Sequence, residues 1–118
     1  MAAARMRRVN EAVREVVSAH IAGDLKDPRL GFVTVTGVET SPDLRSARVF
    51  VSVLGAQVER EDSLAALTSA RGFLQAQVGR ELRMKRTPTL DFVNDESIDH
   101  GMRIEQVLIE LAKQEDAK

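Results

Sequence analysis

The stretch GFVTVTGVETSPDLRSARVFVSVLG, from Gly31 to Gly55, constrains the fold more than any other part of the chain. Apolar and polar residues alternate on both sides of the turn-forming sequence Ser41-Pro42-Asp43, first at Val33 and Val35 and then from Ala47 to Val53. A period of two places the apolar side chains of a strand on one face of a sheet. The stretch therefore predicts two antiparallel strands joined in a hairpin.

Helical periodicity flanks this hairpin. Between Arg5 and Ala22 apolar residues recur every three or four positions, and Gly23 provides a stop. A second helical pattern runs from about Asp62 to Arg86, and Thr87-Pro88 then makes the chain extended, because a residue before proline is disfavoured in the helical region. The stretch TLDFV, residues 89–93, predicts a third strand.

A last, shorter helix is predicted within GMRIEQVLIELAKQ, residues 101–114. The predicted order is α-β-β-α-β-α, which indicates an α+β domain with its helices on one face of a small mixed sheet. A chain of 118 residues is long enough to bury a core of its own. We expect one domain at residues 1–112 and a short polar tail at residues 113–118.

The second helical pattern cannot be one straight helix. On a straight helix Arg71 would lie in the middle of the apolar arc that contains Leu67 and Leu74, which would bury a charged side chain. A bend at Ala70-Arg71-Gly72 removes the conflict, because small residues permit two helical segments to meet at an angle. The alternative is that Gly72 only permits close packing against the sheet. Gly72 and a second glycine, Gly79, would each cost about 1 kcal/mol inside a helix.

Charge is unevenly distributed along the chain, although the net charge is only −1. Residues 1–90 contain 14 Lys and Arg against 10 Asp and Glu, whereas residues 91–118 contain 3 against 8. A local basic patch, rather than the total charge, is what binds phosphate. The densest group of cations comprises Arg80, Arg83, Lys85 and Arg86, with only Glu81 beside them.

Recurrence every three residues predicts that Arg80, Arg83 and Arg86 lie together on the helix flank opposite the leucines. We predict that they and Lys85 are the principal phosphate contacts. Secondary contacts are expected near the start of the first helix, where ion pairs of Arg7 and Arg14 with Glu11 are an ordinary alternative. The predicted RNA-binding residues are Arg5, Arg7, Arg8, Arg71, Arg80, Arg83, Lys85 and Arg86.

Several other functions are disfavoured by the sequence. The chain has no cysteine, which excludes disulfides and thiolate chemistry, and it has no apolar run of membrane-spanning length. Asp95, Glu96, Asp99 and His100 could coordinate a cation, but helix capping explains these residues better. His20 lies in the apolar arc of the first helix, where a histidine at the edge of the core is more common than a proton shuttle.

Four ordered blocks resemble the ribosome-binding factor A family: RMRRVNEAVREVV, the hairpin with its preceding DLKDPRL, SARGF, and DESIDHGMRI. This resemblance implies a type II KH-like topology in which the GxxG loop is replaced by a helix, a kink and a second helix. The alanine and the glycine of that kink correspond to Ala70 and Gly72. The direct contact of Arg71 with RNA is an inference from its place between them.

The same resemblance implies a cytoplasmic factor, by default a monomer, that binds the small (30S) ribosomal subunit and its 16S rRNA. Such a factor assists late maturation, including processing of the 16S rRNA 5′ end and adaptation to cold. It is not an enzyme and needs no cofactor or metal. With four phenylalanines and no Trp or Tyr, recognition is expected to use RNA shape and phosphate. The rival hypothesis is a protein-interaction module that docks a basic partner through the acidic last helix.

Overall fold

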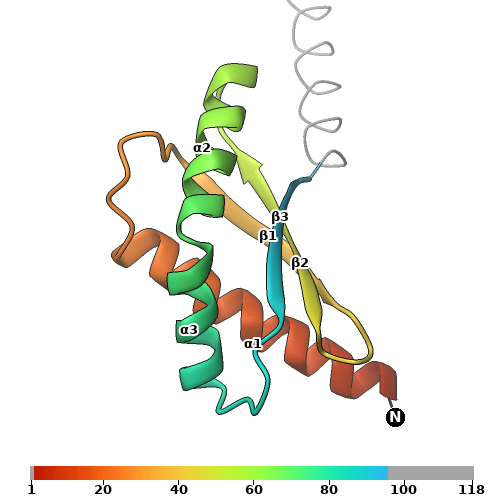
Figure 1. Cartoon of the computed structure of the whole chain (residues 1–118). Helices are drawn as coiled ribbons and strands as arrows, with labels where there is room; N and C mark the ends of the chain where they lie inside the picture. The colour runs from red at the N-terminus through yellow and green to blue at the C-terminus, as the bar shows by residue number, and fades with distance from the viewer. Residues whose placement is uncertain (1, 96–118) are drawn as a thin grey trace, which may run out of the picture.

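The alternating stretch forms an antiparallel hairpin of β1 (Val33–Thr40) and β2 (Ser46–Val53) in this computed structural model, which describes residues 2–95 (Figure 1). The ladder pairs Val33 with Val53 and Thr40 with Ala47. A register shift between Val35 and Gly37 inserts one extra residue into β1. The hairpin predicted from the sequence is therefore present, with a bulge in its first strand.

The third strand, β3 (Thr89–Asn94), pairs in parallel with β2, from Ser46 opposite Thr89 to Val51 opposite Asn94. The strand order is β1-β2-β3, so β2 is the central strand. One antiparallel and one parallel pairing make the sheet mixed. This confirms the small mixed three-stranded sheet expected from the sequence.

The helices of the described region cover one face of this sheet (Figure 1). They are α1 (Ala2–Gly23), α2 (Gln57–Ser69) and α3 (Arg71–Glu81). Burial follows the period of each element, with every second residue of β2 from Ala47 to Val53 buried against the helices. The fully buried core residues include Val13 and Val17 of α1, Leu67 of α2, Leu74 and Val78 of α3, Val49 and Val51 of β2, and Leu90 of β3.

The second helical pattern is divided into two helices, as predicted. Ala70 lies between them, with φ −88° and ψ 2°, and its N–H still donates to the carbonyl of Ala66 at 3.0 Å. The boundaries predicted for this region were wrong at both ends. The pattern begins at Gln57 rather than near Asp62, and it ends at Glu81 rather than at Arg86.

The two glycines of α3 have different surroundings. A Cβ added at Gly72 would meet nothing within 4 Å, so close packing against the sheet does not explain this glycine. A Cβ at Gly79 would lie 2.3 Å from Oγ1 of Thr87, in the connection from α3 to β3. Gly79 is therefore the position at which the returning chain needs the space that glycine leaves.

Three predicted features lie outside the described residues. They are the helix within residues 101–114, the boundary between residues 112 and 113, and the possible cation ligands Glu96, Asp99 and His100. Within residues 2–95, no helix is both long enough and apolar enough to cross a membrane.

Candidate nucleic-acid interface

The candidate interface is built around the end of α3. Leu82 closes the helix with its N–H bonded to the carbonyl of Val78 at 3.0 Å, and Arg83 follows with φ 52°. The N–H of Met84 then bonds back to the carbonyl of Gly79 at 3.0 Å. A left-handed residue directly after the helix, followed by a hydrogen bond from the next N–H back to the last turn, is the Schellman motif. Glycine is the usual residue at the left-handed position. An arginine occupies that position here.

The predicted helix flank carrying Arg80, Arg83 and Arg86 is therefore wrong. Of these three residues only Arg80 is helical, and the other two lie in the connection to β3. Sequence periodicity failed here because Leu82 and Met84 are both packed against the core, which imitates a continuing helical pattern. The hydrogen bonding of the helix end, rather than the apolar spacing, determines where α3 stops.

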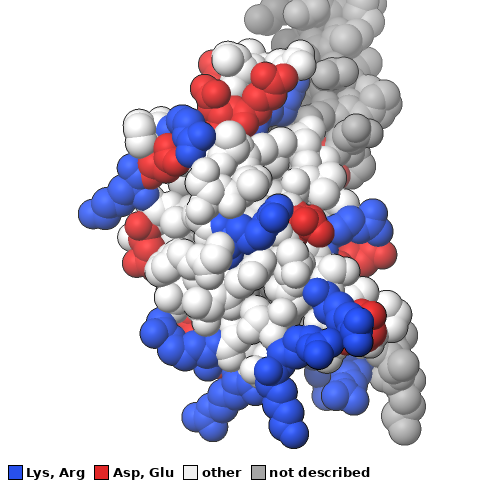
Figure 2. Space-filling view, viewed as in Figure 1, with Lys and Arg blue, Asp and Glu red and all other residues white. Residues whose placement is uncertain are grey.

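The cations nevertheless remain close along the chain and lie on the surface. Arg80, Arg83, Lys85 and Arg86 are all exposed, and none forms an ion pair with a carboxylate of the described residues. Figure 2 shows Lys and Arg gathered at the end of the molecule where α3 leads toward β3 and along the adjoining part of α1. We call Arg80, Arg83, Lys85 and Arg86 the basic turn.

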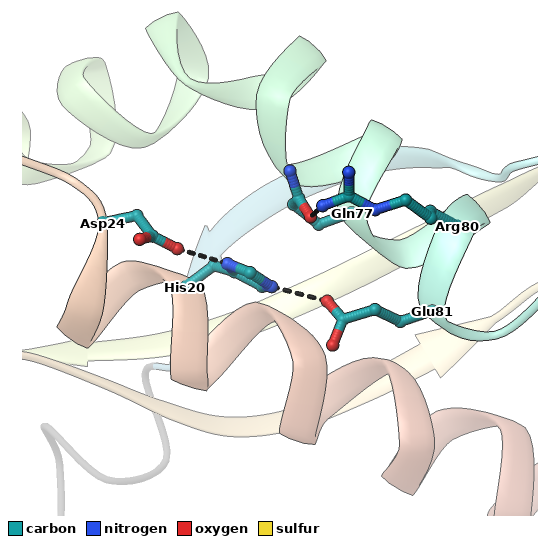
Figure 3. A network of polar contacts seen from close by, with 5 residues as sticks. All are labelled: His20, Asp24, Gln77, Arg80 and Glu81. Atoms are coloured by element: carbon teal, nitrogen blue, oxygen red, sulfur yellow. Dashed lines mark hydrogen bonds and ion pairs between the residues drawn. The ribbon is translucent and has the colours of Figure 1, made fainter.

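The acid nearest to the basic turn in sequence, Glu81, is held by another partner. Its carboxylate lies 2.5 Å from Nε2 of His20, and Nδ1 of the same ring contacts the carboxylate of Asp24 (Figure 3). Beside this contact, the guanidinium of Arg80 donates to the side-chain carbonyl of buried Gln77. Glu81 is thus directed toward α1, and no other carboxylate within residues 2–95 forms an ion pair with the basic turn.

Sequence reasoning assigned His20 to the edge of the core and missed this network. Its side chain is 19% exposed and its ring meets that of Phe73 edge-on, with centroids 5.9 Å apart. Hydrogen bonds to Asp24 and then to Glu81 raise the pKa of His20 above its ordinary 6.5. The spacing of His20 and Asp24 at i and i+4 was a usable signal, whereas Glu81 lies 61 residues away in the sequence.

The secondary residues Arg5, Arg7 and Arg8 are exposed near the start of α1. The first turn of α1 contains no acidic residue. Cations near a helix N-terminus oppose the helix dipole, so their placement there does not stabilise the helix. Glu11 pairs with Arg14, with its Oε2 3.0 Å from Nε, and not with Arg7. No ion pair within residues 2–95 involves the three secondary arginines.

Arg71 is separated from the basic turn by the length of α3. Its guanidinium Nη2 lies 3.5 Å from Oδ1 of Asp91 on β3, and its side chain is 37% exposed. The Nε of Arg71 is buried and has no hydrogen-bond partner in the described part of the chain. The structure therefore places Arg71 in a contact between α3 and the sheet rather than beside the other cations.

The chemistry available at this surface is binding of anions. Exposed guanidinium and ammonium groups donate several hydrogen bonds each and attract phosphate over a distance set by ionic strength. No group of three His, Asp or Glu side chains in residues 2–95 is arranged to hold a metal ion. Polyanion binding is the function that this geometry supports best.

Comparison with known proteins bears on what the polyanion is. The sequence profile described as "Ribosome-binding factor A" matches residues 5–108. A ribosome-binding factor A from Desulforamulus reducens is 42% identical over 111 residues, which cover 94% of this chain and 92% of that protein.

Two structural comparisons agree with this match. The crystal structure of ribosome-binding factor A from Thermus thermophilus aligns with a TM-score of 0.67 at 30% identity, over 75% of this chain and 94% of that chain. A homology model of the Thermus thermophilus factor, fitted into a cryo-EM map of a 30S-RbfA complex, aligns with a TM-score of 0.62 at 31% identity, over 74% and 91% of the two chains. This chain belongs to the ribosome-binding factor A family.

Proposed function

We propose that this protein is a ribosome assembly factor that binds the small (30S) ribosomal subunit through phosphates of its 16S rRNA. The observation that carries the proposal is the family match over residues 5–108, together with the 30S complex into which a related chain was fitted. The basic turn supplies the principal contacts, and Arg5, Arg7 and Arg8 supply secondary ones. The protein acts by binding, without catalysis.

The polarity of the molecule supports one orientation on RNA. Acidic side chains gather over the start of α2, at the opposite end of the view from the basic turn (Figure 2). Glu59, Glu61 and Asp62 in that helix are exposed. Because RNA repels carboxylates and attracts cations, the end with the basic turn faces the rRNA and the start of α2 faces away.

Recognition by shape and phosphate is supported by the scarcity of aromatic groups at the basic turn. Of the four phenylalanines, Phe32 is 80% exposed but directly precedes β1, and Phe73 is 41% exposed and lies against His20. Phe50 lies under the guanidinium of Arg48, with 5.9 Å between the guanidinium carbon and the ring centroid. Stacking platforms for single-stranded bases need exposed rings within a basic groove. Contacts with the backbone of structured rRNA need only the cations.

Co-sedimentation with purified ribosomal subunits tests this proposal. The protein should sediment with small subunits at low salt and not with large subunits. A matched pair of variants separates specific contacts from total charge: Lys85→Gln/Arg86→Gln in the basic turn and Arg45→Gln/Arg60→Gln elsewhere. Binding should weaken strongly for the first pair and little for the second. Equal sedimentation with both subunits would overturn the assignment.

We further propose that binding assists late maturation of the small subunit, including 16S rRNA 5′-end processing and growth in the cold. Cells that lack the protein should then accumulate 16S rRNA with an unprocessed 5′ end, more strongly at low temperature. Mapping the 5′ ends of 16S rRNA by primer extension measures this directly. A normal ratio of mature to precursor ends in the cold would remove the maturation role and leave the binding role standing.

A further inference from the structure

The ring of His20 bridges two carboxylates that come from different parts of the fold. Its Nδ1 contacts the carboxylate of Asp24, in the turn after α1, and its Nε2 lies 2.5 Å from the carboxylate of Glu81, at the end of α3 (Figure 3). Phe73 of α3 meets the ring edge-on, and β1, which also packs on α1, contributes apolar side chains such as Val35 to the core. The charged groups that act on His20 are therefore Asp24 and Glu81.

Only a charged imidazole satisfies both carboxylates. A protonated histidine donates from both ring nitrogens, whereas a neutral histidine carries one N–H and presents a lone pair at the other nitrogen. His20 also lies in the last turn of α1, where the helix dipole favours a positive charge. The hydrogen bonds to Asp24 and then to Glu81 accordingly raise the pKa of His20 above its ordinary 6.5.

Of the two carboxylates, Glu81 is the one that we expect to leave when the ring loses a proton. Asp24 stays beside His20 because the backbone joins them, with the N–H of Asp24 donating to the carbonyl of His20 at 2.9 Å. Glu81 belongs to another helix, and its side chain is 45% exposed. The neutral ring therefore keeps its N–H toward Asp24 and turns the lone pair of Nε2 toward Glu81, which repels that carboxylate.

A released Glu81 joins the cations of the basic turn. It follows Arg80 directly, and the hydrogen bond from the N–H of Met84 to the carbonyl of Gly79, at 3.0 Å, folds the end of the helix into one tight turn. Away from His20, the carboxylate neutralises a neighbouring guanidinium and repels an approaching phosphate. The contact with His20 removes this competitor, because the carboxylate then faces α1.

We propose that His20 is a positioning residue of the RNA interface, which holds Glu81 away from the basic turn as long as the ring is protonated. Binding to RNA phosphate is then strongest below pH 6.5 and weakens as the pH rises and His20 releases Glu81. This inference rests on the proposed function, because it concerns the affinity of the same basic turn. The expected effect is that of one exposed charge pair, about two- to fivefold in affinity.

The affinity for purified small subunits, measured at pH 6.0 and at pH 8.5 with constant ionic strength, tests this proposal. The wild type should bind about two- to fivefold more weakly at the higher pH. Glu81→Gln should bind with the same affinity at both pH values, because it has no carboxylate to release. The matched control is Glu15→Gln, which removes an exposed carboxylate of α1 and should keep the pH dependence of the wild type.

A second pair of variants separates the charge of His20 from its packing. His20→Ala should bind weakly at both pH values, since Glu81 is then always released, and His20→Ala/Glu81→Gln should recover the affinity. Both variants lose the same contact with Phe73, so a purely structural role of His20 would leave both equally weak. The NMR ring signals of His20, identified by their absence in His20→Ala, should titrate at a lower pH in Glu81→Gln than in the wild type.

The opposite results would overturn the proposal. The same pH dependence in the wild type and in Glu81→Gln would refute the release of Glu81 and would leave the proposed function intact. A double variant as weak as His20→Ala would mean that His20 acts through packing alone. Failure of the wild type to bind small subunits at either pH would instead refute the proposed function, and this inference with it.

Discussion

Replacing Arg83 with glycine should raise the stability of the fold and weaken RNA binding at the same time. Arg83 has φ 52°, and the left-handed conformation costs a residue with a Cβ about 1–2 kcal/mol. Glycine removes this strain but adds about 0.4–1 kcal/mol of conformational entropy to the unfolded chain. The net expectation for Arg83→Gly is a gain of about 0.5–1 kcal/mol in the free energy of unfolding, or a rise of about 2–5 °C in Tm.

The matched variant for this prediction is Arg83→Ala, which removes the same charge but keeps a Cβ in the left-handed conformation. Urea unfolding should show Arg83→Gly more stable than the wild type, whereas Arg83→Ala should show no gain. Both variants should lower the affinity for small subunits to a similar extent, because both lose one phosphate contact. Equal stability of the two variants would refute the assignment of Arg83 as the left-handed residue of the helix end.

Two further predictions concern the packing of α3 against its neighbours. Gly79→Ala should lower the free energy of unfolding by about 1–2 kcal/mol, because the new Cβ meets Thr87. Gly72→Ala should leave the free energy of unfolding unchanged or raise it by up to about 1 kcal/mol, because its Cβ meets nothing. Urea unfolding measures both values, and a Gly79→Ala variant more stable than Gly72→Ala would contradict the prediction. Hydrogen bonds to Asp24 and then to Glu81 raise the pKa of His20 above 6.5, so the contribution of His20 to stability is complete below pH 6.5 and is lost as the pH rises through the folded-state pKa. The free energy of unfolding measured from pH 5.5 to 9 should show this decline in the wild type and not in His20→Gln. Identical profiles would exclude the contacts of His20 with Asp24 and Glu81 as its source.

The parts of the fold that local patterns determine were predictable from the sequence. Alternation around Ser41-Pro42-Asp43 predicted the hairpin, and the conflict at Arg71 predicted the division between α2 and α3 at Ala70. The end of α3 was not predictable in this way. Its stop depends on the hydrogen bond from Met84 to Gly79 and on a left-handed arginine, which periodicity does not record.

The candidate site shows the same division between local and long-range information. The density of cations from Arg80 to Arg86 was visible in the sequence, because charge is a property of each residue. The contact of Glu81 with His20 was not visible in the sequence, because His20 is on α1 and meets Glu81 only through the packing of α1 against α3. The contact of Arg71 with Asp91 was likewise not visible in the sequence, and the RNA contact expected of Arg71 stays a prediction.

The salt dependence of binding to purified small subunits tests the central claim most directly. Each phosphate contact contributes about 0.7–0.9 to the slope of log affinity against log salt. Arg80→Gln/Lys85→Gln/Arg86→Gln should therefore have a slope shallower than that of the wild type by about 2–3, while Arg60→Gln on α2 should match the wild type. Circular dichroism provides the control for folding. A triple variant with the wild-type slope would contradict the claim that the basic turn binds rRNA.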